Sequence, residues 1–121
     1  FRAGGRWEMG ADKLPTHRTD STGLDQACAS LSVDHCFDQW TGAVELRDTQ
    51  MSICITSSLG HLVVYTNPQQ DFVAIEPVSH VNNALSMANA NPQRLAELGV
   101  HILQPGETLS ASMRIETGST P

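Results

Sequence analysis

The stretch that decides the fold reads Asp71-Phe72-Val73-Ala74-Ile75-Glu76-Pro77-Val78-Ser79-His80. Its unbroken apolar run, rich in Phe, Val and Ile, predicts a strand that is covered on both faces. Proline at position 77 cannot donate a hydrogen bond to a neighbouring strand, and it favours extended backbone in the residue before it. The sequence therefore predicts a buried strand that ends abruptly at a carboxylate and a proline.

Glu76 is the first candidate functional residue because it would be held in extended backbone at the end of this hydrophobic strand. A carboxylate in such a place is partly desolvated, and once ionised it can act as a proton acceptor. The alternative is that Glu76 only ends the strand and faces water. The ten residues alone leave both interpretations open.

Length and composition limit the classes of protein to consider. With 121 residues, of which 40% are hydrophobic and 17% charged, the chain is expected to form one small globular domain, residues 1–121. Aromatic residues make up only 5%, so the core should be mainly aliphatic. A formal charge of −6 argues against nucleic-acid and anionic-membrane partners, which require a basic surface. No apolar run approaches the roughly 20 residues of a membrane span.

The cysteines indicate the redox setting. Cys28, Cys36 and Cys54 are odd in number and contain no Cys-x-x-Cys pair, so neither a disulfide framework nor a zinc site is expected. The segment 1–5 has no hydrophobic region of the kind found in a signal peptide. We therefore expect reduced thiols and a cytoplasmic location.

Several further segments have the period-two pattern of strands. Residues 36–40 and 43–47 flank Thr41-Gly42 and predict a hairpin, while 51–56, 61–66 and 109–116 predict further strands. Residues 1–30 are expected to be loop-rich with a short edge strand at 6–9, and residues 31–116 to form the β core. Strands spaced in this way suggest a mainly β fold, an antiparallel β-sandwich.

Residues 82–98 have a different character. They are rich in helix formers, and Pro92 suits the first position of a helix. One or two short helices are therefore expected around 82–98, ended by Gly99. The tail from Thr117 onward is expected to fray.

Four short motifs occur in an informative order: Asp34-His35-Cys36-Phe37, Val64-Tyr65-Thr66, Glu76-Pro77-Val78-Ser79-His80 and Leu103-Gln104-Pro105-Gly106-Glu107-Thr108-Leu109. Together they resemble the C-terminal part of the aldose 1-epimerase (galactose mutarotase) family. The resemblance implies a partial galactose mutarotase-like sandwich that binds a free aldohexose. It also implies interconversion of the α and β anomers by acid/base ring opening, without metal or cofactor.

The resemblance also assigns roles to residues. Glu76 matches the catalytic base of the family, and Asp34 matches a carboxylate that binds sugar hydroxyls. Thr66, His80 and Trp40 are further substrate-binding candidates, although core packing is the alternative for Trp40 and a purely incidental position is the alternative for His80. Because adjacent strand residues face opposite ways, His35 should point away from the sugar if Asp34 faces it.

The chain also departs from the family. The catalytic acid of the family is a histidine in a more N-terminal segment, and none of the five histidines here matches it. The family commonly has asparagine where this chain has Cys36. A partial sandwich would leave strand edges open, so a homo-oligomer that pairs through exposed strand edges is expected.

Two alternatives to a complete enzyme remain open at this stage. The chain could be a non-catalytic carbohydrate-binding or assembly module derived from an epimerase. It could also be a fragment without a function of its own. A sugar-phosphate epimerase is disfavoured because Arg18, Arg47, Arg94 and Arg114 are scattered along the sequence rather than clustered.

Overall fold

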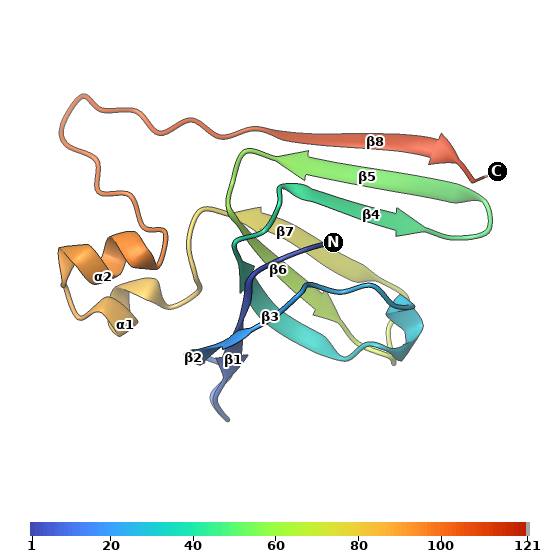
Figure 1. Cartoon of the computed structure of the whole chain (residues 1–121), viewed down its shortest axis with the longest axis horizontal. Coiled ribbons are helices and arrows are strands. Elements are labelled where there is room, and N and C mark those ends of the chain that lie inside the picture. The colour runs from blue at the N-terminus through green and yellow to red at the C-terminus, as the bar shows by residue number, and fades with distance from the viewer. Residues whose placement is uncertain (121) are drawn as a thin grey trace.

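A computed structural model describes residues 1–120 and shows a mainly β, antiparallel sandwich-like fold, as the sequence predicts (Figure 1). The strands are β1 Gly5–Met9, β2 Pro15–Asp20, β3 Val33–Asp38, β4 Ala43–Arg47, β5 Met51–Ser57, β6 His61–Thr66, β7 Val73–Val78 and β8 Met113–Ser119. The short helices are α1 Ala84–Ala88 and α2 Pro92–Glu97. A 3-10 turn at Cys28–Ser30 lies between β2 and β3. None of the helices formed by residues 1–120 has the length and apolar character needed to cross a membrane.

The strands form two separate sheets. One has five strands in the order β2-β1-β3-β6-β7, and the other has three in the order β4-β5-β8. Consecutive strands β3 and β4 therefore lie in different sheets, and the predicted hairpin around Thr41-Gly42 is wrong. The connection crosses between the layers because Trp40 is buried in the core, where its backbone N–H donates to the Gly60 carbonyl.

The core between the sheets is mainly aliphatic, as expected from the composition. Phe37, Leu62 and Val64 from the five-stranded sheet pack with Val44 and Ile55 from the three-stranded sheet. We call this side of the five-stranded sheet its sandwich face. Phe37 and Leu62 have no exposed surface, so this contact excludes water completely at its centre.

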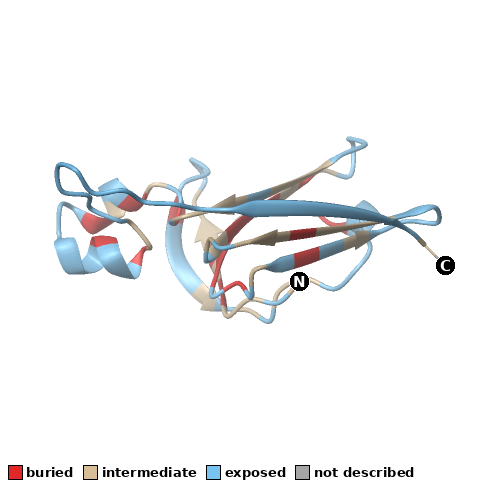
Figure 2. Cartoon of the chain, turned by 90° about the horizontal axis from the view of Figure 1, so that it is seen from above, coloured by how far each residue is buried: buried red, intermediate tan, exposed pale blue. Residues whose placement is uncertain are grey.

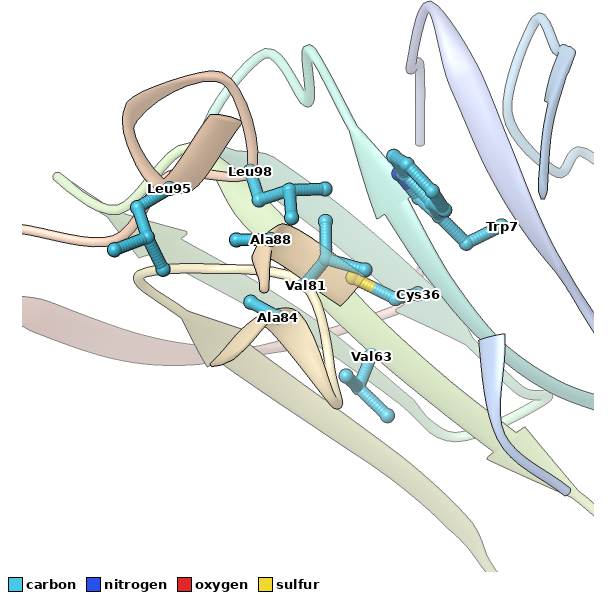
Figure 3. Packing of buried hydrophobic residues seen from close by; sticks show 8 residues of the cluster. All are labelled: Trp7, Cys36, Val63, Val81, Ala84, Ala88, Leu95 and Leu98. Atoms are coloured by element: carbon cyan, nitrogen blue, oxygen red, sulfur yellow. The ribbon is translucent and has the colours of Figure 1, made fainter. Parts of the chain in front are cut away.

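The two helices cover the opposite side of the same sheet, which we call the helix-covered face. Figure 3 shows its cluster of Trp7, Cys36, Val63, Val81, Ala84, Ala88, Leu95 and Leu98. The predicted helix start is confirmed: Pro92 is the first residue of α2, and the Asn91 side chain accepts a hydrogen bond from the Arg94 N–H. Gly99 ends the helical segment with φ +87°, a conformation that favours glycine.

The strand that contains Glu76 differs from its prediction. β7 is an edge strand and is only partly buried, not covered on both faces, and Phe72 before it is 57% exposed. The strand also continues through Pro77, which lies opposite Leu62. An edge position tolerates proline because one side of the strand needs no donor. The apolar run therefore reflects one buried face and an incomplete cover on the other.

Three further expectations near the chain ends are wrong. β2 lies within the predicted loop, because its sequence Pro-Thr-His-Arg-Thr-Asp carries no apolar alternation. β1 is not an edge strand, since it lies between β2 and β3. β8 begins at Met113 rather than at 109 and extends to Ser119, so most of the predicted frayed tail is paired with β5.

Candidate functional site

Asp34 lies on the helix-covered face of the five-stranded sheet. It is two residues from Cys36 on β3, and residues two apart on a strand share a face. Its side chain borders a surface cavity of about 340 Å³. The cavity is also lined by Met9, Lys13, Ser32, Val33, His35, Tyr65, Thr66 and Asn67. Asp34 therefore lies at an open depression with both polar and apolar lining residues, rather than in the core.

Glu76 lies on the same face as Asp34. It pairs with Val63, which pairs in turn with Cys36, so the two carboxylates occupy diagonal positions on either side of β6. Regular sheet spacing puts their Cα atoms about 12 Å apart. Glu76 is exposed and does not line the Asp34 cavity. The structure thus brings the predicted carboxylates to one face but not into one cavity.

The other predicted binding residues do not join this pair. Thr66 is buried on the sandwich face, where its hydroxyl donates to the Leu31 carbonyl at 2.9 Å and accepts from the Val33 N–H at 3.0 Å. Trp40 is 6% exposed in the core, and its Nε1 donates to the Ala43 carbonyl. His80 is exposed, and its Nδ1 lies 2.7 Å from the Ser79 hydroxyl. Of the three, Thr66 alone borders the Asp34 cavity.

His35 points away from Asp34, as predicted from strand alternation. Its Nδ1 accepts a hydrogen bond from the Asp34 backbone N–H at 3.2 Å, and its Nε2 lies 3.4 Å from a Glu8 carboxylate oxygen. Burial would raise the pKa of Glu8, but hydrogen bonds from Arg6 and Thr19 outweigh it and lower that pKa. His35 therefore belongs to a polar cluster that joins β1, β2 and β3.

A second polar cluster has no counterpart in the sequence-based predictions. Asp38, at the end of β3, accepts hydrogen bonds from Arg18 Nε at 2.7 Å, Arg18 Nη2 at 2.9 Å and Trp7 Nε1 at 2.9 Å. These residues border a surface cavity of about 440 Å³ together with His61 and Arg94. The partners lie 20 and 31 positions apart in sequence, so no local pattern reveals them. Asp38 and Arg18 neutralise each other's charge, so we interpret the cluster first as a structural link between β1, β2 and β3.

His61 lies at the edge of this second cavity on the helix-covered face. Its Nδ1 is buried and has no hydrogen-bond partner among the described residues. Burial lowers the pKa of His61, and the charge of Asp38 opposes this effect only in part. Gly99 packs so closely that a Cβ atom there would lie 2.5 Å from the ring. His61 is therefore a partly buried histidine that is mainly neutral at pH 7.

We expect stability to fall as the pH drops below about 6.5. Burial also lowers the pKa of His35, so the unfolded chain binds protons at both histidines before the folded chain does. The contribution is fully present above the unfolded pKa of 6.5, and is lost as the pH falls through 6.5 toward the folded pKa. Each of the two protons can contribute at most about 1.4 kcal/mol per pH unit to the slope.

Urea unfolding at several pH values between 5 and 8 tests this linkage. The variant His61→Gln should show a smaller loss of unfolding free energy on acidification than the wild-type chain. The variant His101→Gln, at an exposed position, is the matched control and should keep the wild-type slope. Equal slopes for His61→Gln and the wild-type chain would contradict the role given to burial.

Cys36 lies on β3 and faces the helix-covered side of the sheet. It is packed under the helices, and burial raises the pKa of its thiol to about 12, so it is unreactive. Within residues 1–120, no group of three or more His, Cys, Asp or Glu side chains is placed to hold a metal ion. Comparison with protein-family models, curated proteins and solved structures found no match.

Proposed function

We propose that this chain is an aldose 1-epimerase-like domain that binds a free aldohexose on the helix-covered face of its five-stranded sheet. One observation carries the proposal: Asp34 and Glu76, the two carboxylates matched to family motifs, project from the same face on either side of β6. Alternative registers would have put them on opposite faces, since shifting a strand by one residue inverts its side chains.

The residues near Asp34 suit a sugar. The Asp34 carboxylate accepts hydrogen bonds from hydroxyl groups, and such charge-assisted bonds are short and specific. Lys13 and Asn67 border the same cavity and add further donors and acceptors. Tyr65, which is opposite Asp34 in register, offers an aromatic ring for the apolar C–H side of a pyranose.

In the catalytic version of this proposal, Glu76 is the base. It takes the proton of the anomeric hydroxyl while an acid protonates the ring oxygen; the ring opens, the C1 carbonyl rotates and the ring closes on the other side. A general base of this kind contributes about 10²- to 10⁴-fold in rate. The reaction requires both groups to reach one sugar.

A second candidate function is carbohydrate binding without catalysis. The histidine nearest to Glu76 in register on this face is His61, opposite Val78. Burial lowers the pKa of His61, so it is not protonated at pH 7 and is a poor proton donor. This observation favours a binding module that lacks its own catalytic acid.

Two NMR measurements test the proposal. Titration with glucose or galactose should give saturable shifts of the Asp34, Tyr65 and Asn67 amides, and Asp34→Asn should abolish them. Magnetisation exchange between the two anomers then reports catalysis. If the chain is an enzyme, Glu76→Gln should remove exchange while it leaves the shifts in place; if it is a binding module, shifts appear without exchange.

The matched control is Glu45→Gln, which alters an exposed strand carboxylate on the other sheet and should change neither measurement. Absence of saturable shifts with both sugars in the wild-type chain would refute the proposal. An equal loss of binding in Glu45→Gln and Asp34→Asn would also refute it, because the effect would then not be local to the Asp34 cavity.

We further propose a cytoplasmic location. All three cysteines are free thiols, and Cys28 is exposed. An exposed free thiol persists in a reducing compartment, whereas an oxidising compartment would modify it.

A further inference from the structure

The chain exposes more surface than a compact monomer of its size. Its accessible surface is 7930 Å², whereas about 6,400 Å² is expected for a folded monomer of 13.1 kDa. The excess of roughly 1,500 Å² exceeds the ~800 Å² that each partner contributes to a standard protein interface. Residues 101–119 are exposed without interruption, and they include all of β8 (Figure 2).

β8 is the least protected of the four edge strands. β2 and β7 contain Pro15 and Pro77, and β4 has only five residues, which are features that discourage pairing with another chain. β8 has seven residues and no proline. Its Met113 and Ile115 are 58% and 56% exposed. They lie on the same side of the three-stranded sheet as the core residue Ile55, but the five-stranded sheet does not cover them.

The register with β5 fixes which backbone groups face outward. The Ser112 carbonyl accepts from the Ser58 N–H, and the Thr120 N–H donates to the Gln50 carbonyl, so both residues point toward β5 and its ends. In an antiparallel ladder this direction alternates along the strand. Residues 113, 115, 117 and 119 therefore direct their N–H and C=O groups to the open edge.

We propose that β8 pairs antiparallel with β8 of a second copy of this chain, on a two-fold axis through Ile115. Both copies then use the same outward-facing groups, as a two-fold interface requires. Ile115 faces Ile115 of the other copy, and Met113 faces Thr117. The two three-stranded sheets become one continuous sheet of six strands.

The charges of Arg114 and Glu116 favour an axis at Ile115 over an axis one residue to either side. With the axis at Ile115, Arg114 of each copy lies directly opposite Glu116 of the other, which gives two attractive cross-strand pairs. With the axis at position 114 two arginines would face each other, and at position 116 two glutamates would. Like charges directly opposite on a sheet are destabilising. Arg114 and Glu116 already lie 2.8 Å apart within one strand, so in the dimer the four charges alternate in sign.

Sedimentation velocity over concentrations from about 1 to 200 µM tests the dimer at low salt. The wild-type chain should show a reversible monomer–dimer equilibrium. Arg114→Glu and Glu116→Arg should each raise the dimer Kd about tenfold, because two attractive pairs become repulsive. Arg47→Glu is the matched control, since Arg47 and Glu45 form the same type of pair on the other edge of this sheet, and it should leave Kd unchanged.

Mixing the two charge variants separates the interface from effects within the strand. Each variant alone places like charges within its own β8 and also across the interface. A mixture of Arg114→Glu with Glu116→Arg restores opposite charges only across the interface. The mixture should therefore dimerise more tightly than either variant alone.

Three results would overturn the proposal. The first is a wild-type chain that stays monomeric throughout the concentration range. The second is a dimer whose Kd responds to Arg47→Glu as strongly as to Arg114→Glu. The third is a mixture of the two variants that associates no better than its components.

Discussion

Replacing Phe37 with alanine is expected to lower the free energy of unfolding by about 3–5 kcal/mol. Phe37 has no exposed surface, and it lies where the two sheets meet. The substitution removes a large apolar surface from the core and leaves a cavity that β-strands on both sides cannot collapse to fill. Because a small domain is stable by only about 5–15 kcal/mol, this loss would remove a large share of its total stability.

Urea unfolding followed by tryptophan fluorescence measures this effect, with Phe72→Ala as the matched control. Phe72 is 57% exposed. Among the described aromatic residues its ring lies near only that of Tyr65, with the two ring centroids 5.9 Å apart. Its replacement should cost less than about 1 kcal/mol. Similar losses in the two variants would mean that Phe37 is not central to the sandwich core.

Replacing Asp38 with alanine is expected to lower the free energy of unfolding by about 2–4 kcal/mol. The substitution leaves the buried Trp7 Nε1–H without an acceptor and removes both hydrogen bonds to Arg18. Arg18 is partly exposed and can turn toward water, which limits the loss. Most of the loss in unfolding free energy therefore comes from the Trp7 Nε1–H, which is left buried without a hydrogen-bond acceptor.

Two further variants locate the source of the effect. Asp20→Ala removes the other carboxylate of Arg18, but Asp20 is fully exposed, so its loss should change the free energy of unfolding far less than Asp38→Ala does. Asp38→Asn retains an acceptor for Trp7 without the charge and should fall between the two. An Asp38→Ala variant as stable as Asp20→Ala would show that the Trp7–Arg18–Asp38 cluster contributes little.

Sequence patterns predicted the local structure better than the way the sheets are assembled. β4 and β6 have their predicted bounds, because alternation and turn residues act over a few positions. Sheet membership depends on partners far away in sequence. Thr41-Gly42 looks like a hairpin turn locally, but the burial of Trp40 and the pairing of β5 with β8 make it a crossing between layers.

The candidate site shows the same division. Alternation along β3 was sufficient to predict that His35 points away from Asp34, because that relation is between neighbours. The place of Glu76 on an exposed edge depends on which strands follow in the sheet, and no residue near Glu76 encodes that. The Trp7–Arg18–Asp38 cluster was missed because its members come from three different strands.

The pairing of β5 with β8 also determines the order in which the molecule assembles. They pair residues more than fifty positions apart, from Ser57 with Met113 to Met51 with Ser119, so a long loop must close before the two strands can form hydrogen bonds. The hairpin of β4 and β5 needs only a short turn and can form early. Because all its side chains are exposed, we expect β8 to be the last strand to join during folding and the first to open in the folded chain.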